Sequence, residues 1–284
     1  MIQYLYLGRM GYEEALRLQE ELVTLRQQGR IENTLLLLEH PPVLTLGRNA
    51  NRSNVLASDE LLAARGVMLH EIKRGGDVTY HGPGQLIGYP IFDLRSLRNA
   101  QGGRLGPVDF VRQMEEALIR VCAAFGVRAG RIAGLTGVWC HLRWGGTLDE
   151  DSGAKASDAP QGERKIAAIG IHVSRGVVSH GFAFNVRTDL RDFQLINPCG
   201  ITDRPVTSLE REVAEAEKLP GLETLAHEAA RQFGFVLGEQ VLALESVTAL
   251  RKIAQEPLPA EDTPLQVPRE VERLRGETDK PQRA

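Results

Sequence analysis

The sequence is poor in cysteine and offers no arrangement typical of metal ligands. Three cysteines in 284 residues, at positions 122, 140 and 199, are too few and too scattered for a disulfide framework. No two of them have Cys-x-x-Cys spacing, and Cys140 stands directly beside His141, which is not the spacing of a zinc-ligand pair. These absences exclude a disulfide-stapled secreted domain, and we expect no metal.

Charge and hydropathy argue against two further classes of protein. The formal net charge is -3 at pH 7, and no basic stripe with interleaved aromatic residues occurs, so we expect no nucleic acid partner. No apolar run approaches the roughly 20 residues of a transmembrane helix. Residues 1–10 lack the basic start and the apolar stretch of a signal peptide. We therefore expect a cytoplasmic protein that does not enter the membrane.

Apolar periodicity predicts helices and strands that alternate along the chain. Helical spacing covers residues 13–28, 58–65, 108–125 and 222–233, and strand-like runs cover residues 34–39, 43–46, 68–72, 86–94, 137–140, 166–173 and 176–186. Ser174-Arg175 joins the last two strands as a hairpin, and Thr207 with Glu210 predicts a capping box that opens a helix through residue 218. Short links between strands imply antiparallel neighbours, so we expect an α/β fold with a mixed sheet and packed helices.

Two segments differ from the rest in composition. Residues 144–164 are rich in Gly, Asp, Ser, Ala and Glu without apolar periodicity, which predicts a mobile insertion. Residues 256–284 are rich in proline and charge, which predicts a disordered tail after a helix over residues 243–254. We expect one domain over residues 1–240, followed by a helical extension and tail over residues 241–284.

A glycine-rich stretch is the most informative part of the sequence. Residues 74–86 read Arg-Gly-Gly-Asp-Val-Thr-Tyr-His-Gly-Pro-Gly-Gln-Leu. Glycine allows a ligand to approach the main chain closely, so we expect a long ligand-cradling loop between the strands at 68–72 and 86–94. The Gly-x-Gly-x-x-Gly order of dinucleotide sites and the Gly-Lys-Ser/Thr ending of phosphate-binding loops are both absent.

One cysteine stands where a nucleophile would be presented. Cys199 lies between Pro198 and Gly200, a pair that predicts a bend, whereas the other two cysteines read as core residues of a helix and a strand. A thiol attacks as the thiolate, which a nearby cation stabilises. Lys165 is the candidate cation, although a lysine before a strand is also typical of solvated surface. His81 is a second candidate, either as the partner of the thiol or as a residue that orients a substrate.

Three segments together resemble a known family. They are residues 74–86, Lys-Ile-Ala-Ala-Ile-Gly at 165–170 and Asn-Pro-Cys-Gly-Ile at 197–201, and they resemble, in this order, the octanoyltransferases of lipoate biosynthesis, within the biotin/lipoate protein ligase superfamily. The resemblance covers residues 1–240 and implies that superfamily's mixed-sheet catalytic fold, with a catalytic dyad of Cys199 and Lys165. The substrate-binding positions that it implies are Arg74, Gly75, Gly76, Asp77, Val78, Thr79, Tyr80, His81, Ala168, Ile169, Gly170, Gly181, Phe182 and Ala183.

The same resemblance implies an activity and its partners. An octanoyl or lipoyl group would pass from acyl carrier protein to Cys199 as a thioester, and then to a lysine of an apo lipoyl domain. The expected acceptors are the lipoyl domains of 2-oxoacid dehydrogenases and the glycine cleavage H protein. Amide formation from a thioester is downhill, so we expect no ATP and no cofactor. We also expect a monomer, with a basic patch for acidic partners that includes Arg48, Lys73 and Arg74.

Three alternatives stay open on the sequence. An ATP-dependent lipoate or biotin protein ligase shares the expected fold but activates the acid as an adenylate and needs no nucleophilic cysteine. An amidotransferase would move octanoyl between lipoyl domains, also through a cysteine. A scaffold that binds acylated carriers without turnover predicts an inert Cys199. The sequence of residues 80–85 and the bend expected at residues 198–200 favour the transferase.

Overall fold

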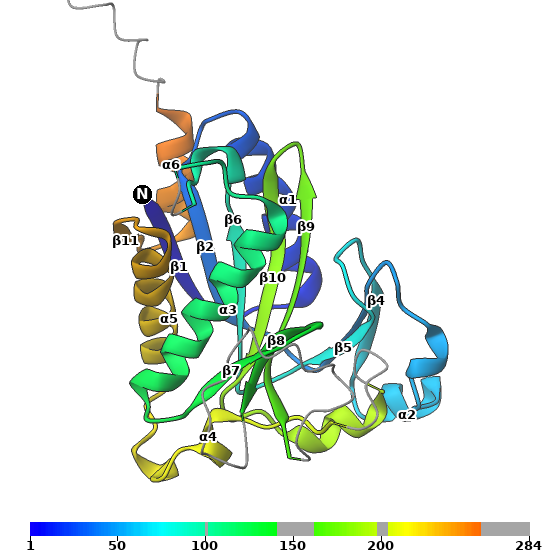
Figure 1. The fold of residues 1–284 in the computed structure, drawn as a ribbon. Helices are drawn as coiled ribbons and strands as arrows, with labels where there is room; N and C mark the ends of the chain where they lie inside the picture. Colours follow the sequence, from blue (N-terminus) through cyan, green and yellow to red (C-terminus); the bar gives the residue numbers. More distant parts are fainter. Residues whose placement is uncertain (100–101, 141–161, 198–203, 257–284) are drawn as a thin grey trace, which may run out of the picture. The chain divides into compact units, whose positions relative to one another are not determined.

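A large mixed sheet forms the centre of the fold (Figure 1). The computed structural model describes residues 1–99, 102–140, 162–197 and 204–256. Within these residues eight strands lie in the order β11-β1-β2-β6-β10-β9-β8-β7. Their bounds are β1 Ile2–Arg9, β2 Asn33–Glu39, β6 Gln85–Ile91, β7 Ala129–Ile132, β8 Leu135–Cys140, β9 Arg164–Ser174, β10 Val177–Asn185 and β11 Val241–Ala243. β11, β1 and β2 run parallel, and every later pair of neighbours is antiparallel.

A second sheet lies beside the first and carries part of the glycine-rich motif. Its described strands lie in the order β4-β3-β5, with bounds Met68–Glu71, Val43–Leu46 and Val78–His81. The short helix α2 (Asp59–Ala64) and the 3₁₀ helix η4 (Leu190–Leu195) pack against this sheet through a core of their own. The motif is therefore not one long loop, because its middle residues form the strand β5.

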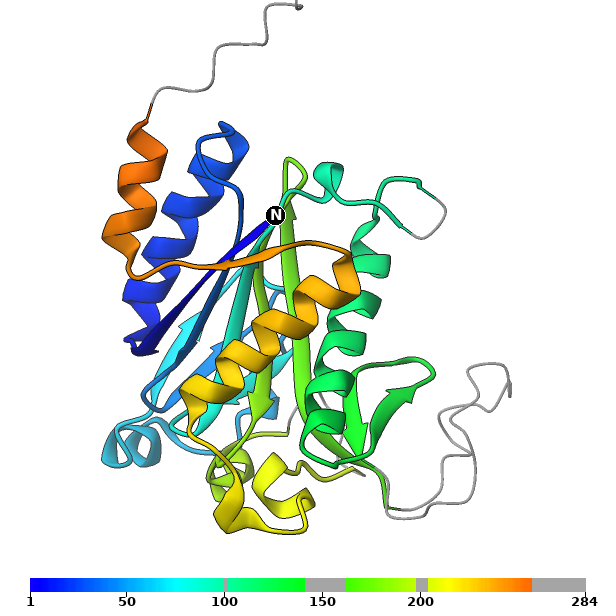
Figure 2. The same cartoon turned by 90° about the vertical axis from the view of Figure 1, so that its left-hand side faces the viewer.

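Helices cover both faces of the large sheet, as the turned view of Figure 2 shows. Their bounds are α1 Tyr12–Gln27, α3 Pro107–Ala124, α5 Leu222–Leu237 and α6 Val247–Gln255. In β2, Leu35 and Leu37 join the core beneath α3 and α5, while Leu36 and Leu38 join the core beneath α1 and α6. Since side chains alternate along a strand, this continuous leucine run reflects a strand that is buried on both faces.

Most of the expected elements are confirmed, and one helix is wrong. The helix expected from Thr207 to residue 218 reduces to α4 (Leu209–Glu212) and a 3₁₀ turn at Ala216–Lys218. The Thr207 hydroxyl donates to Glu212, so it caps no helix, and the backbone becomes extended at Val213. The β9–β10 turn lies one residue later than expected, at Arg175 and Gly176, both with positive φ as short hairpin turns require.

Some expectations concern residues that the structure does not describe. The insertion expected over residues 144–164 lies outside them up to residue 161, and so does the tail from residue 257 onward. Residues Met1–Ala254 form one compact unit that includes β11, and a domain boundary at residue 240 stays a prediction. The extension expected as a helix from residue 243 begins instead as β11, and its helix starts at Val247.

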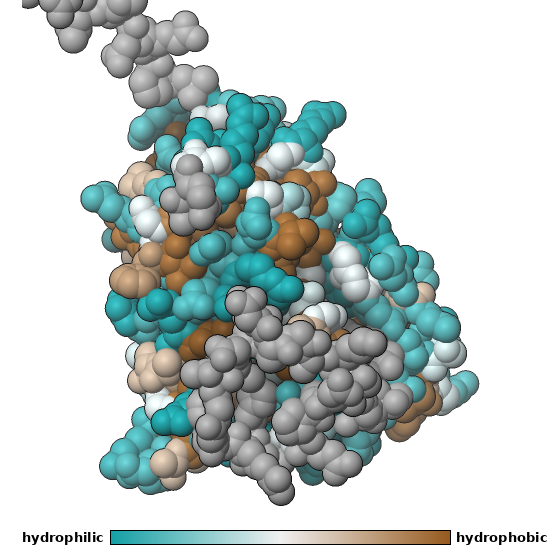
Figure 3. Space-filling model, in the orientation of Figure 1, coloured by the Kyte–Doolittle hydropathy of each residue, from teal (hydrophilic) through white to brown (hydrophobic). Residues whose placement is uncertain are grey.

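The surface carries few large apolar side chains. On the face drawn in Figure 3, hydrophilic residues surround smaller apolar areas outside the grey region. Val108 on α3 and Phe235 on α5 are the most exposed large hydrophobics of the described chain, at 72% and 65%. Among the helices that the structure describes, none combines the length and the apolar character needed to cross a membrane.

Candidate functional site

A pocket lies between the two sheets and collects residues from motifs that are far apart in sequence. It is bounded by the loop before β5, by β5 itself, by β9 and β10, and by the start of α1. Eleven of the expected substrate-binding residues line it: Arg74, Gly75, Gly76, Thr79, His81, Ala168, Ile169, Gly170, Gly181, Phe182 and Ala183. The first motif, the lysine motif and the segment after His180 therefore meet at one place, although their roles there stay predictions.

Three expected residues lie away from the pocket. Val78 and Tyr80 alternate with Thr79 and His81 along β5, so their side chains enter the core of the small sheet. The Tyr80 hydroxyl donates to Asp192 Oδ2 at 2.7 Å, which ties the motif to η4.

The third of these residues, Asp77, has a structural contact instead. Its carboxylate accepts from the backbone N–H of Asn51 and from the side chain of Asn54. Asp77 therefore braces the loop that follows β3, and its placement indicates a structural role.

Close backbone approaches explain two of the glycines at this site. A Cβ on Gly170 of β9 would lie 2.9 Å from the carbonyl oxygen of Gly75, and Gly75 donates its N–H to Ile171 at 3.0 Å. A Cβ on Gly47 would lie 2.3 Å from the carbonyl oxygen of Gly76. Only glycine permits such contacts between main chains. The motif loop therefore lies directly against β9, which closes one side of the pocket.

Arg74 is a buried cation that is hydrogen-bonded to Thr45 of the small sheet. Its guanidinium donates to both the carbonyl and the hydroxyl of Thr45, with Nη2 distances of 2.7 and 2.9 Å. The prediction that Arg74 belongs to a docking patch on the surface is therefore wrong. Arg48 and Lys73 are exposed, and their charges contribute to lowering the pKa of His172 after the effect of its burial. These two basic residues thus lie near the β9 edge of the site.

His81 is a neutral imidazole whose tautomer the surrounding hydrogen bonds define. Gln85 uses its amide nitrogen to donate to Asn185 and to the Tyr80 carbonyl, so its Oε1 faces His81 Nδ1 as an acceptor at 2.9 Å. Nδ1 therefore carries the proton. Burial first, and then His40, lowers the pKa of His81 to about 3. A base of that strength would not hold a proton from a thiol, so the geometry favours an orienting role.

Sequence reasoning missed Tyr12, Ile72 and Tyr89, which also line the pocket. His40 accepts from the Tyr89 hydroxyl at 2.8 Å and donates to the Met10 carbonyl at 2.7 Å. Burial lowers the pKa of His40 to about 4 and raises that of Tyr12 to about 12. In the sequence Tyr12 lies just before the helix expected over residues 13–28, and Tyr89 lies inside the strand expected over residues 86–94.

His180 completes the wall and adopts an unusual backbone conformation. Its φ is +56°, and non-glycine residues seldom occupy this left-handed region. The backbone N–H of His180 donates to Gln19 Oε1 of α1 at 2.9 Å. Burial lowers the pKa of His180 to about 4, with a smaller effect from Arg74. This strained residue lies within β10, and both His180 and the following Gly181 line the pocket.

Lys165 is the second residue of β9, three residues before the part of the strand that lines the pocket. Its Nζ lies 4.6 Å from the ring centroid of Trp139, and the Arg204 guanidinium carbon lies 5.9 Å from the same ring. Arg204 pairs with Glu163, and both side chains are almost fully buried. The Lys165 ammonium therefore lies over an aromatic face, which attracts it electrostatically.

The expected nucleophile, Cys199, lies outside the described residues, but both flanks of its segment are described. Upstream, the N–H of Asn197 donates to the Asn54 carbonyl at 2.7 Å. Downstream, Lys165 donates its N–H to the Pro205 carbonyl and accepts from the Thr207 N–H, both at 2.9 Å. The chain before residue 198 is thus attached to the 3₁₀ turn at Arg52–Asn54, and the chain after residue 203 is attached to β9.

Cys122 and Cys140 are confirmed as core residues. Both are essentially unexposed. Burial raises the pKa of Cys122 well above its usual value and that of Cys140 to about 12. Neither thiol is available as a thiolate near neutral pH.

Comparison with known proteins places this site in a family. The model of the lipoyl protein ligase A/B catalytic domain matches residues 11–233. The chain belongs to this family. An octanoyltransferase from Acidobacterium capsulatum is 61% identical over 247 residues, covering 87% of this chain and 94% of the relative. An octanoyltransferase from Koribacter versatilis is 51% identical over 274 residues, covering 96% and 97%. Because these relatives are octanoyltransferases, the protein is an acyltransferase.

Solved structures agree with the expected fold. A bi-partite lipoate protein ligase from the archaeal lipoylation system of Thermoplasma acidophilum superposes with a TM-score of 0.62 at 17% identity, over 89% of this chain and 91% of that chain. A lipoate-protein ligase A bound with ATP superposes with a TM-score of 0.56 at 16% identity, over 89% and 93%. At these identities the likeness concerns the fold, and it confirms the mixed α/β architecture of the lipoate ligases.

Proposed function

We propose that this acyltransferase moves an octanoyl or lipoyl group from acyl carrier protein to a lysine of an apo lipoyl domain, through a thioester on Cys199. The octanoyltransferase relatives support the transferred group. The archaeal ligase that shares the fold is described with its E2 lipoyl domain, which supports a lipoyl domain as acceptor. The acceptors would be domains of 2-oxoacid dehydrogenases and the glycine cleavage H protein, met by a cytoplasmic monomer.

The reaction would proceed in two balanced steps. The Cys199 thiolate attacks the donor thioester, a new carbon–sulfur bond forms, and the carrier leaves as a thiolate that takes up a proton. The lysine amine of the lipoyl domain then attacks the acyl-enzyme, loses a proton and releases Cys199. Lys165 would stabilise the thiolate and carry the proton between these steps. His81, neutral and hydrogen-bonded, would orient the acyl group.

One observation carries this proposal: Lys165 is bonded through its main chain to residues that closely follow Cys199. Pro205 is six residues from Cys199, and a chain spans at most about 3.3–3.6 Å per residue, so the tether is at most about 22 Å long. On its other side, Cys199 is two residues from Asn197, which is bonded to Asn54. Residues 168–170 of β9, the strand that carries Lys165, line the pocket.

Intact-mass analysis after mixing with octanoyl-acyl carrier protein, without ATP, tests the proposal. We expect the mass of one octanoyl group to be gained, to be labile to excess thiol, and to be absent from Cys199→Ser. We expect Lys165→Ala to form the adduct far more slowly. Cys122→Ser is the matched control because that thiol is buried, and it should be acylated like the wild type.

Two other outcomes would overturn the proposal in different directions. An adduct that requires ATP, with an acyl-adenylate as intermediate, would assign the protein to the ligases. A protein that accepts octanoyl only from an octanoylated lipoyl domain, and not from the acyl carrier protein, would be an amidotransferase. Competition between octanoyl-acyl carrier protein and an octanoylated lipoyl domain at equal concentration distinguishes an amidotransferase from the proposed transferase.

A further inference from the structure

A chain of buried hydrogen bonds runs from the pocket toward the strand that carries Lys165. Its members are Arg74, Thr45, His81, Gln85, Asn185 and Thr207, and every side chain in it is buried. The distances are 2.9 Å from Arg74 Nη2 to Thr45 Oγ1, 3.4 Å from Thr45 Oγ1 to His81 Nε2, 2.9 Å from His81 Nδ1 to Gln85 Oε1, 2.9 Å from Gln85 Nε2 to Asn185 Oδ1, and 2.9 Å from Asn185 Nδ2 to the Thr207 carbonyl.

The two ends of this chain force a single direction on all its bonds. A guanidinium can only donate and a carbonyl can only accept, so Asn185 must turn its amide nitrogen to the Thr207 carbonyl. Its oxygen then accepts from Gln85, whose own oxygen accepts from His81 Nδ1. His81 Nε2 is left to accept the Thr45 hydroxyl proton, while Arg74 donates to the Thr45 oxygen. Bonds aligned in this way polarise and strengthen one another.

The last link reaches the strand of Lys165. Thr207 donates its N–H to the Lys165 carbonyl at 2.9 Å, and its hydroxyl donates to Glu212, which is paired with Arg164. All three polar groups of Thr207 are therefore engaged. Because Thr207 pairs with β9 while its carbonyl is held by Asn185 of β10, a shift of the Asn185 amide would displace the main chain beside Lys165.

We propose that Gln85 and Asn185 are positioning residues that hold the Lys165 end of β9 at a defined place relative to the acyl pocket. This inference rests on the proposed function, because it assigns Lys165 to the reaction. Neither amide lines the pocket, so their effect would pass through His81 on one side and Thr207 on the other. A misplacement of about 1 Å in reacting groups lowers a rate by about a hundredfold, so we expect loss of these amides to lower kcat and leave KM for the donor nearly unchanged.

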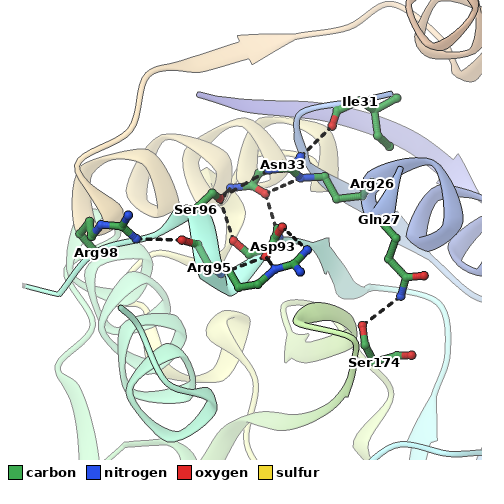
Figure 4. A network of polar contacts seen from close by, with 9 residues as sticks. All are labelled: Arg26, Gln27, Ile31, Asn33, Asp93, Arg95, Ser96, Arg98 and Ser174. Atoms are coloured by element: carbon green, nitrogen blue, oxygen red, sulfur yellow. Dashed lines mark hydrogen bonds and ion pairs between the residues drawn. The ribbon is translucent and has the colours of Figure 1, made fainter. Parts of the chain in front are cut away.

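Asn33 provides a matched control at the other end of the same sheet. Its buried amide accepts from Arg26 Nε and from the Asp93 N–H, both at 2.9 Å, and donates to Ser96 (Figure 4). Asp93 follows the end of β6, whereas Gln85 opens this strand. Eight residues at about 3.3 Å each separate Asp93 from Gln85, and no member of the Asn33 network lines the pocket. Replacing Asn33 or Asn185 by alanine leaves buried polar groups without a partner in both cases.

The experiment compares Asn185→Ala, Gln85→Met and Asn33→Ala with the wild type, by thermal unfolding and by the rate of octanoyl adduct formation from octanoyl-acyl carrier protein. We expect all three variants to lose thermal stability. We expect only Asn185→Ala and Gln85→Met to form the adduct 10- to 100-fold more slowly at saturating donor. If Asn185→Ala does not fold, the rates of adduct formation by Gln85→Met and Asn33→Ala are compared instead, and they test the positioning role.

The result that overturns the inference is distinct from the one that overturns the proposed function. Equal saturating rates in the wild type and in the folded amide variants would remove the positioning role. A rate loss of the same size in Asn33→Ala would reduce the effect to general destabilisation and would also remove it. If the wild type gains no octanoyl group at all, the proposed function fails before the variants are compared.

Discussion

The Lys165 ammonium lies 4.6 Å from the ring centroid of Trp139, and the two residues are paired across the β8–β9 ladder. Trp139 is fully buried, and Arg204 approaches the same ring. The face of an aromatic ring attracts a cation electrostatically, so the Trp139 ring helps to fix the position of the Lys165 ammonium.

Replacing Trp139 should separate the effect of the ring from the effect of its volume. Trp139→Phe keeps an aromatic face, and Trp139→Leu does not. A buried cation–π contact contributes up to about 2 kcal/mol, and 1.4 kcal/mol is a tenfold change in rate. We expect Trp139→Leu to form the octanoyl adduct about tenfold more slowly than Trp139→Phe. Equal rates for the two variants, measured at saturating donor, would contradict a role for the ring.

Three buried imidazoles predict that the protein loses stability in mild acid. The pKa values of His40, His81 and His180 are lowered to about 4, 3 and 4, mainly by burial. Between these values and the ordinary pKa near 6.5, the unfolded chain binds protons that the folded chain does not. Stability therefore falls as the pH drops from about 6.5 toward 4, by up to about 1.4 kcal/mol per pH unit for each group.

Urea unfolding at several pH values between 4.5 and 6.5 measures this slope. In His81→Gln one of the three imidazoles is removed, so we expect the slope to decrease by the contribution of one proton. An unchanged slope in His81→Gln would mean that His81 is protonated in the folded protein.

The sequence predicts most of the helices and strands, but few of the tertiary contacts between them. Continuous burial of the leucines in β2 and the helical face of α3 are local patterns, and both elements were predicted. β1 was missed because its apolar residues point to both faces without clean alternation, although its Tyr4 and Tyr6 favour a strand. The prediction of a capping box at Thr207 is wrong because the Thr207 hydroxyl donates to Glu212 instead of capping a helix. Tertiary contacts here override the local helix preference.

The site shows the same division. Motif residues such as Arg74 and Gly170 are visible in the sequence, because glycine runs and isolated cations are unusual there. Tyr12 and Tyr89 carry no such signal, since tyrosines are common in helices and strands. Only the fold shows that these two line the pocket. Gly47 is likewise explained only by the approach of Gly76, a contact across two loops.

Gly47 should tolerate no side chain. A Cβ there would lie 2.3 Å from the Gly76 carbonyl oxygen, so the motif loop would have to move. Overpacking of this kind costs about 1–3 kcal/mol. We expect Gly47→Ala to lower the free energy of unfolding by that amount and to raise KM for the acyl donor. Gly75→Ala is the comparison, because its Cβ would meet only Ile171 at 3.5 Å, and its stability should change by less than about 0.5 kcal/mol.

Tyr80 should couple the glycine-rich motif to the segment that leads to residue 198. Its hydroxyl donates to Asp192 of η4, and burial followed by this hydrogen bond raises the pKa of Tyr80 above its usual value. Hydrogen bonds to charged groups contribute about 1.5–3 kcal/mol, so we expect Tyr80→Phe to lose stability in that range. Because η4 continues into Asn197, we also expect slower formation of the octanoyl adduct.

Tyr4→Phe is the control for this change, since it removes a hydroxyl that is hydrogen-bonded to His227 at an exposed position. That variant should lose less than about 1 kcal/mol and keep the wild-type rate of acylation. Asp192→Asn adds a second comparison, because the amide oxygen still accepts from Tyr80 while the charge is removed. If the bond carries the coupling, Tyr80→Phe should have a smaller effect in the Asp192→Asn background than alone. Fully additive losses of stability and rate would show that the two residues act independently.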